Sequence, residues 1–441
     1  MEIADAITAQ GGRALVVSNG GDGVHELKRA GAEHIRLPVH SKNPLVLYTN
    51  IQRLVDLIKA ERVDIIHARS RAPAWSAYFA AKRAGIPLVT TFHGTYTAGN
   101  ALKRRYNSVM VRGERVIAIS RFIGGHLHKN YGVPANKIRI IHRGVNLDRF
   151  NPAKVTAERV TVLASDWRLE DGLPIVMLPG RLTRWKGQTM FIEAIAKLGR
   201  RDIRCLLVGG DQGRTEYRQE LENLVHNHGL GEIVRIVDHC DDMPAAYMLT
   251  DVVVSASTDP EAFGRILIEA QALGRPVVAS NHGGAQETVI EGETGWLFPP
   301  GDVDALATLL DQILNLSRED RAQLAEKAIA NVRLNFSKQL MCDKTLEVYR
   351  EILQQAAKKK APVKKKTAAK KKAPAKKKTA AKKKAPAKKK TAAKKKAPAK
   401  KKTAAKKKAP AKKKTAAKKK APVKKKTAAK KKAPAKKKVS G

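Results

Sequence analysis

The chain has 441 residues and a formal net charge of +47, but 14 Lys-Lys-Lys triplets that recur every six residues from Lys358 supply 42 of these charges. The remaining +5 belongs to an ordinary, mildly basic sequence of about 355 residues, which is long enough for two domains. Three scattered cysteines, no apolar run near 18 residues and no recognisable leader argue against a disulfide framework, a membrane span and a signal peptide, and favour the cytoplasm.

The first half is predicted to alternate strands with amphipathic helices. The helix expected at 50–61 places Ile51, Leu54, Val55 and Ile58 at the i, i+3, i+4, i+7 spacing of one buried face. Strands are expected at 13–19, 34–39, 64–68, 87–93 and 114–120, and further helices at 23–31, 72–85 and 120–132. The chain opens with a helical pattern at 2–12, so we expect the first sheet to lack the strand and glycine-rich turn that usually begin such a domain.

A polar, irregular stretch at about 155–174 is predicted to break the pattern, which then restarts. Strands are expected at 174–180, 204–210, 234–239, 251–257 and 276–280, and helices at 187–199, 215–229, 265–274, 285–292, 302–316 and in one last segment to about 355. Alternating strands and helices favour parallel, doubly wound sheets. We therefore predict an α/β fold of two Rossmann-like domains, 1–160 and 172–355, that face a ligand cleft, followed by a disordered tail at 356–441.

The strongest motif is EAFGRILIEAQALGRPVVAS, in which Glu261 and Glu269 are eight residues apart. Phe263 and Gly264 are expected on a loop, with a helix beginning directly after them. The N-terminus of a helix suits a diphosphate, and a carboxylate one turn deeper suits the two hydroxyls of a ribose. The alternative is that both acids are solvated charges on a surface helix.

Two cations follow the strand at 174–180, in the motif GRLTRWKG. Arg181 and Lys186 are expected near the start of the helix that carries Glu269. Fixed cations there would stabilise the negative charge of a departing nucleoside diphosphate without a metal. The alternative is a basic pair on the surface.

Two further motifs end in glycine. His93 follows a strand in TFHGTY and could bind a sugar hydroxyl or act near the reacting centre, while His67 in DIIHARS is a weaker candidate of the same kind. In NHGGAQETV, Gly283 and Gly284 would allow a ligand to approach the backbone closely. The alternatives are structural histidines and a plain glycine turn.

These four motifs in this order, with HRGVNLDRF near the domain junction, resemble the retaining GT-B glycosyltransferases of family four over about residues 1–350. The resemblance implies sugar transfer with retention from a nucleotide-sugar donor, without a bound metal or cofactor. It implies that Glu261 and the backbone of Phe263 and Gly264 contact the donor, and that Glu269 holds the ribose. Arg181 and Lys186 would hold the diphosphate, and His93 would lie beside the transferred sugar.

The Lys-rich tail repeats KKKAPAKKKTAA and resembles the tails of linker histones and bacterial histone-like proteins. It has no aromatic residue for base stacking, so we expect sequence-blind, salt-sensitive binding to the phosphates of DNA or another polyanion. The alternatives are adsorption to any anionic surface and docking on anionic lipid at the inner membrane face, which would suit a lipid-linked acceptor.

Two hypotheses for function follow. The first is an enzyme that transfers a hexose-type sugar from a nucleotide donor to a glycan or glycolipid acceptor of the cell envelope. The second is a nucleoid-associated polyanion binder with an incomplete enzyme domain. They are compatible, since the tail could serve only to localise the enzyme.

Overall fold

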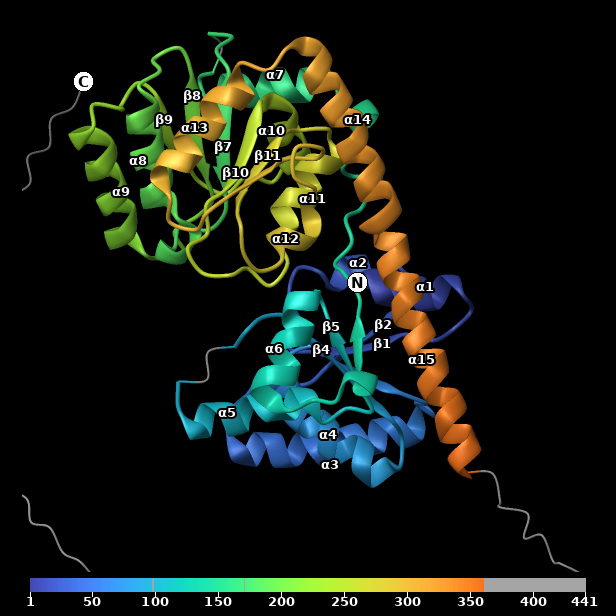
Figure 1. Ribbon diagram of the computed structural model, residues 1–441. Coiled ribbons are helices and arrows are strands. Elements are labelled where there is room, and N and C mark those ends of the chain that lie inside the picture. Colours follow the sequence, from blue (N-terminus) through green and yellow to red (C-terminus); the bar gives the residue numbers. More distant parts are fainter. Residues whose placement is uncertain (97–98, 170, 361–441) are drawn as a thin grey trace, which may run out of the picture. The chain divides into compact units, whose positions relative to one another are not determined.

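The computed structural model describes residues 1–96, 99–169 and 171–360. Residues 356–360, expected to begin the disordered tail, are helical in the structure, and the rest of the expected tail, 361–441, lies outside these ranges. In the described part, the paired strands of all three sheets run parallel, and helices alternate with them along the chain (Figure 1).

The N-terminal half contains two separate parallel sheets. β1 (Leu15–Ser18) pairs with β2 (Glu33–Arg36), and a second sheet has the order β3-β4-β5-β6. In the described ranges the first element is a helix, and no pairing joins β1 to β3. The other elements of this half are α1 (Glu2–Ala9), α2 (Val24–Arg29), α3 (Pro44–Ala60), β3 (Ile66–Ala68), α4 (Arg71–Ala84), β4 (Leu88–Phe92), α5 (Ala101–Asn107), η1 (Ser108–Val111), β5 (Arg115–Ala118), α6 (Arg121–Tyr131), η2 (Ala135–Lys137), β6 (Ile138–Ile140) and η3 (Pro152–Lys154).

The C-terminal half is built on one six-stranded sheet of order β12-β11-β10-β7-β8-β9. β7 is buried along its whole length, as is typical of a parallel sheet covered on both faces. Its elements are α7 (Ala157–Asp166), β7 (Ile175–Pro179), η4 (Arg184–Lys186), α8 (Gln188–Leu198), β8 (Arg204–Val208), α9 (Thr215–Asn227), β9 (Val234–Val237), α10 (Met243–Leu249), β10 (Val252–Ser255), α11 (Arg265–Ala272), β11 (Val277–Ser280), α12 (Ala285–Thr288), β12 (Trp296–Phe298), α13 (Val303–Leu314), α14 (Arg318–Asn335) and α15 (Lys338–Lys360).

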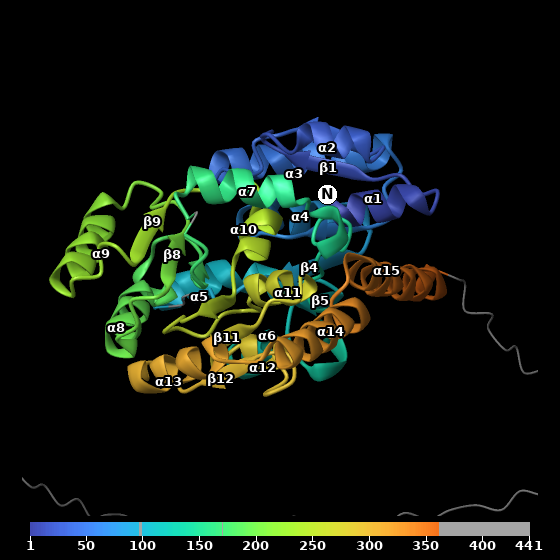
Figure 2. The same ribbon diagram turned by 90° about the horizontal axis from the view of Figure 1, so that it is seen from above.

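The two faces of this sheet have separate cores. Val176 and Leu178 of β7 pack with α8 and α13, whereas Met177 packs on the opposite side with α10 and α11. Helices α8 and α13 lie side by side, and so do α7 and α10 (Figure 2). The chain builds outward from β7 through β8 and β9, then returns to build outward through β10, β11 and β12. The order therefore reverses between β7 and β10, and ligands of doubly wound sheets bind at the carboxyl ends of such strands.

The structure corrects three expectations about secondary structure. Residues 157–166 form helix α7, although this stretch was expected to be irregular. Its partly buried side chains Val160, Leu163, Ala164 and Trp167 have helical spacing and pack on the core, so a short amphipathic pattern was present. The expected last helix is two helices, α14 and α15. The short elements β6, α10 and β12 were not expected.

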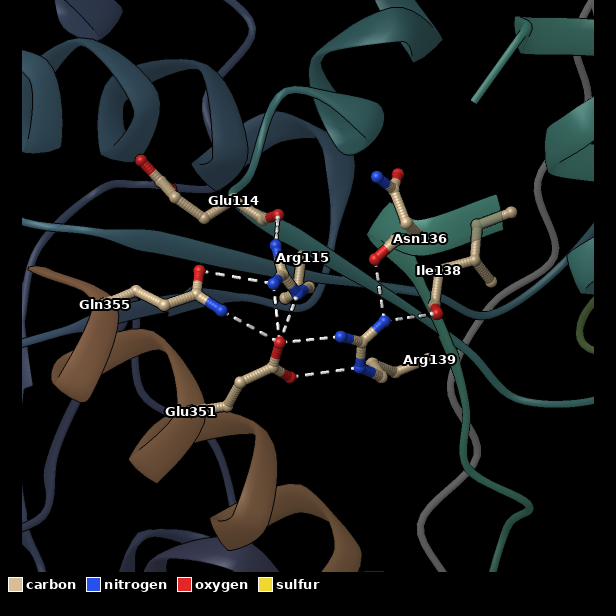
Figure 3. A network of polar contacts seen from close by, with 7 residues as sticks. All are labelled: Glu114, Arg115, Asn136, Ile138, Arg139, Glu351 and Gln355. Atoms are coloured by element: carbon tan, nitrogen blue, oxygen red, sulfur yellow. Dashed lines mark hydrogen bonds and ion pairs between the residues drawn. The ribbon is translucent and has the colours of Figure 1, made fainter. Parts of the chain in front are cut away.

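Helix α15 packs along α1 and the four-stranded sheet (Figure 1). Its apolar face contributes Met341, Leu346 and Ile352 to a core shared with Ile3 and Val89. A polar network continues this contact at its far end (Figure 3).

Glu351 of α15 is the centre of that network. Its Oε1 accepts from the Nη2 atoms of Arg115 on β5 at 2.5 Å and of Arg139 on β6 at 2.6 Å. Burial alone would raise the pKa of Glu351, but the hydrogen bonds from the two arginines outweigh this and hold the pKa below its usual value. The ionised carboxylate therefore stabilises the attachment of α15 to this sheet.

We expect Glu351→Gln to lower the free energy of unfolding by about 1 kcal/mol at pH 7, the upper range for a solvent-exposed ion pair. Because the folded pKa of Glu351 is depressed, its contribution is present above the unfolded pKa of about 4.3 and is lost as the pH falls below it. Urea titrations at pH 7 and pH 3 measure this. Glu347→Gln, on the exposed side of the same helix, is the control. A difference between Glu351→Gln and parent that persisted at pH 3 would contradict the assignment.

Candidate active site

The loops that follow β7 and β10 meet where the strand order reverses. The first loop carries Lys186 in η4, and the second carries Glu261. The Nζ atom of Lys186 lies 2.6 Å from Oε1 of Glu261, and these side chains are 13% and 14% exposed. The backbone N–H of Thr258 also donates to the carbonyl of Trp185 at 2.8 Å. The structure thus brings together two motifs that lie 75 residues apart in the sequence.

One oxygen of Glu261 receives all its side-chain contacts. The hydroxyl of Ser257 donates to Oε1 at 2.5 Å, and the hydroxyl of Ser255 approaches it at 3.5 Å, beside the Lys186 contact. Among the described residues, no side chain donates to Oε2. A carboxylate held rigidly through one oxygen can accept hydrogen bonds from a ligand hydroxyl through the other.

Glycines let backbone pack directly on this loop. A Cβ atom at Gly187 would lie 1.8 Å from the carbonyl oxygen of Ala256. Cβ atoms at Gly283 and Gly284 would lie 2.4 Å from the carbonyl oxygen of Glu261 and 2.3 Å from Cα of Phe263. Gly283 and Gly284 were expected to admit a ligand. What they admit in the structure is the loop that carries Glu261.

His282, which was not among the predicted site residues, supports the same loop through a hydrogen bond. Its Nε2 lies 2.9 Å from the carbonyl oxygen of Ser257, so Nε2 carries the proton and donates. Its Nδ1 is buried and has no hydrogen-bond partner in the described ranges. The HGG sequence that begins with His282 can be recognised in the chain, but the contact of His282 with Ser257 depends on the tertiary fold.

Helix α11 begins directly after Gly264, which has a left-handed φ of +79°. Glu269 lies on the second turn, where it pairs with Arg265 at 3.0 Å and accepts from the hydroxyl of the buried Tyr247 at 3.2 Å. Burial raises the pKa of the Glu269 carboxyl, and the charge of Arg265 opposes this shift. Glu269 is therefore a largely buried hydrogen-bond acceptor on the second turn of α11.

Two other predicted residues lie differently from the Glu261 cluster. Arg181 is exposed, and within the described ranges its guanidinium donates one side-chain hydrogen bond, to Gln212 at 3.4 Å. The side chain of Phe263 is 3% exposed and packs in the core against His142 and Phe336. Because this side chain is buried, a ligand at the loop could reach Phe263 only through its backbone.

His93 follows β4 in the N-terminal half, and within the described ranges its ring forms no hydrogen bond or ion pair with Glu261 or Lys186. Burial, followed by the charges of Arg69 and Arg143, lowers the pKa of His93 to about 3. His67 has a different position, because its ring bonds to Tyr349 at 2.5 Å and to Thr91 at 2.6 Å. These two contacts give His67 a structural role, whereas His93 is a neutral imidazole at neutral pH.

The N-terminus of α6 is held by a carboxylate from the HGGAQETV motif. Glu287 accepts from the backbone N–H groups of Arg121 and Phe122 at 2.7 and 2.8 Å, and pairs with His142 at 2.9 Å. Burial would raise the pKa of Glu287, but the bonds from His142 and the two N–H groups lower it overall. Sequence reasoning missed Glu287 because its partners are distant in the chain.

A hollow of about 470 Å³ lies over α8 and α9, away from these residues. Its charged lining residues are Glu216 and Glu220, which would repel a phosphate. The cluster around Glu261 is therefore the better candidate for an anionic ligand. Separately, none of the helices in the described ranges is both long enough and apolar enough to cross a membrane.

Two parallel sheets in the N-terminal half and one doubly wound parallel sheet in the C-terminal half, with a Lys–Glu pair where the order of the last sheet reverses, agree with a GT-B architecture. The family model "Glycosyl transferases group 1" matches residues 162–331, and "Glycosyltransferase Family 4" matches residues 1–149. The chain belongs to these glycosyltransferases and is an enzyme of that class.

Individual relatives agree with this assignment. A D-inositol 3-phosphate glycosyltransferase of Salinispora arenicola is 31% identical over 317 residues, which are 66% of this chain and 69% of that protein. A glycosyltransferase crystal structure from Rickettsia africae shares 39% identity at a TM-score of 0.75, and the match covers 80% of this chain and 93% of that one. An Anabaena protein crystallised with UDP-glucose shares 25% identity at a TM-score of 0.69, over 79% and 94% of the two chains. This chain spans 49% of the length of a Corynebacterium efficiens relative and 71% of that of a Mycolicibacterium smegmatis relative.

The depressed pKa of His93 predicts that the folded protein loses stability in acid. Its folded pKa of about 3 lies below the unfolded value of about 6.5, so its stabilising contribution is complete above pH 6.5 and is lost as the pH falls toward 3. Between pH 7.5 and pH 4.5 the free energy of unfolding should fall in both proteins. After allowing for solvent screening, we expect the fall to be about 1 kcal/mol smaller in His93→Gln than in the parent.

Urea titrations at the two pH values measure this difference. His228→Gln, at an exposed position in α9's C-terminal cap, is the control and should follow the parent. Equal losses in the parent and His93→Gln would show that His93 is not held neutral by its surroundings.

Proposed function

We propose that this enzyme transfers a hexose-type sugar from a nucleotide-sugar donor to a cell-envelope glycan or glycolipid acceptor, with retention of anomeric configuration and without a metal. The observation that carries the proposal is the Lys186–Glu261 pair at the reversal of strand order, beside the start of α11. The bond that breaks joins the anomeric carbon to a phosphate oxygen, so negative charge builds on the diphosphate.

Lys186, Arg181 and the N-terminus of α11 are the groups that would meet this charge. The Lys186 ammonium has three donors, and the Glu261 contact uses one, so the others remain for phosphate oxygens. Among the residues that the structure describes, no side chain caps the first N–H groups of α11. A helix end with free N–H groups favours an anion, and preorganised donors stabilise the leaving group as it departs.

Glu261 and Glu269 would bind the two sugars of the donor. The free Oε2 of Glu261 would accept from hydroxyls of the transferred sugar. Glu269, deeper along α11, would accept from the ribose diol. The raised pKa of Glu269 reflects an acceptor that is largely removed from water, where a hydrogen bond to a ligand is strong.

His93 would contact the transferred sugar as a neutral ring. A neutral imidazole has one donor and one acceptor nitrogen, so it can bind a sugar hydroxyl without adding positive charge near the anomeric carbon. This role agrees with a pKa of about 3, which leaves the ring uncharged throughout the physiological range.

A panel of nucleotides tests the donor site. At 100 times its dissociation constant, the correct nucleoside diphosphate should stabilise the parent by about 2.7 kcal/mol, while Glu269→Ala should lose most of this because the ribose contact is gone. Thermal shifts with UDP, GDP and ADP, and with their sugar conjugates, measure the effect. Glu326→Ala, an exposed acid on α14, is the control. If no nucleotide stabilises the folded parent, the donor site is refuted.

The anomeric configuration of the product, read by NMR, tests retention separately.

We propose as a second function that the Lys-rich tail binds polyanions such as DNA, because its triplets contain no acidic residue to neutralise them. If ten lysines contact duplex DNA, the logarithm of the binding constant should fall with the logarithm of salt concentration at a slope of about −9. Fluorescence anisotropy at several salt concentrations measures the slope, with a chain ending at Lys360 as control. Anionic and neutral vesicles in the same assay distinguish lipid from DNA. A slope near zero would contradict electrostatic binding.

A further inference from the structure

Arg69 and Arg143 lie near each other without an acidic partner. Arg69 follows β3, and Arg143 follows β6. Both are partly buried, and both line one small cavity of about 20 Å³ whose other lining residues are mostly apolar, with His67, Thr91 and Thr345 as the polar ones. Across the described ranges, neither guanidinium forms an ion pair or a side-chain hydrogen bond. Other arginines of this half, such as Arg115, hold a carboxylate.

The electrostatics show that this proximity is unfavourable without a ligand. Burial lowers the pKa of Arg143, the charges of Arg69 and Arg265 lower it further, and Glu2 opposes the shift. The charges of the same two arginines also lower the pKa of His93, which follows β4. Partly buried like charges destabilise a fold, so a bound anion would relieve this cost.

We propose that Arg69 and Arg143 form an anion site that binds a phosphoryl group of the sugar acceptor. The proposal rests on the proposed sugar transfer, in which His93 lies beside the transferred sugar. Guanidinium groups bind phosphate through paired N–H donors, which gives both affinity and orientation. The cavity has room for about one water, so the phosphoryl group contacts the arginines from their solvent side.

The donor diphosphate has the same chemistry and is the competing source of the anion. The acceptor is favoured because both arginines come from the N-terminal half, whereas the Lys186–Glu261 cluster and α11 belong to the C-terminal half. Arg265, the first residue of α11, already pairs with Glu269. A phosphoryl group at Arg69 and Arg143 would therefore be a second anion, bound together with the donor.

The test uses the full chain and inorganic phosphate as the probe. Calorimetric titration compares the parent with the double variant Arg69→Gln/Arg143→Gln and with Arg53→Gln, an exposed arginine of α3. The Lys-rich tail is unchanged in all three, so differences between them report on the site. We expect the double variant to lose about tenfold to hundredfold in phosphate affinity, as for the loss of charged hydrogen bonds, and Arg53→Gln to match the parent.

Two further measurements make each outcome decisive. The double variant should unfold at the same or a higher temperature than the parent, because it loses like-charge repulsion; this shows that it folds. Its affinity for the nucleoside diphosphate that binds the parent should be unchanged. Equal phosphate affinity in all three proteins would overturn the proposal. A parallel loss of nucleoside diphosphate affinity would assign the arginines to the donor and also overturn it. If the parent binds no nucleotide, the proposed function fails, while the phosphate titration still tests the arginine site.

Discussion

The close packing of backbone around residues 255–264 is the constraint on which the site depends. Gly187 presses on this loop from the β7 side, and Gly283 and Gly284 press on it from the β11 side, at distances that exclude any Cβ atom. The loop cannot shift toward either neighbour, so the carboxylate of Glu261 is held where Lys186 can reach it. Preorganisation of this kind lets a site meet developing charge without rearranging. The glycines thus act through the loop they confine.

Contacts from the N-terminal half reach the same loop. The hydroxyl of Ser120 caps α6 and also donates to the carbonyl of Ala262 at 2.6 Å. Glu287 occupies the first N–H groups of α6, so that helix end is already neutralised by a carboxylate. In the described part of the chain, no side chain caps the start of α11. Of these two helix ends, α11 is therefore the one whose positive end is left for a ligand anion.

The sequence predicted those parts of the molecule that depend on local pattern. Long buried runs such as β7 and amphipathic helices such as α3 were found, and the α/β class with parallel sheets was confirmed. Short elements such as β6 and β12 carry too little pattern to be distinguished from loops. The E-x7-E spacing correctly placed Glu261 before α11 and Glu269 within it. It could not show the Lys186 pair, the support from His282 or the Glu287 cap, because each joins residues brought together only by the tertiary fold.

The binding of an anion depends on which cations near the site are already neutralised by a carboxylate. Lys186 is balanced by Glu261 and Arg265 by Glu269, so these two pairs together add no net charge where the donor would bind. A diphosphate bound there would draw on the remaining donors of Lys186, on Arg181 and on backbone N–H groups. Such directional donors would select an anion by shape, whereas the proposed binding of polyanions by the Lys-rich tail would depend on charge alone. Arg69 and Arg143 differ from both, because within the described ranges neither guanidinium has an acidic partner and both are partly buried beside one small cavity. For this reason a small anion of defined geometry fits them better than a polymer does.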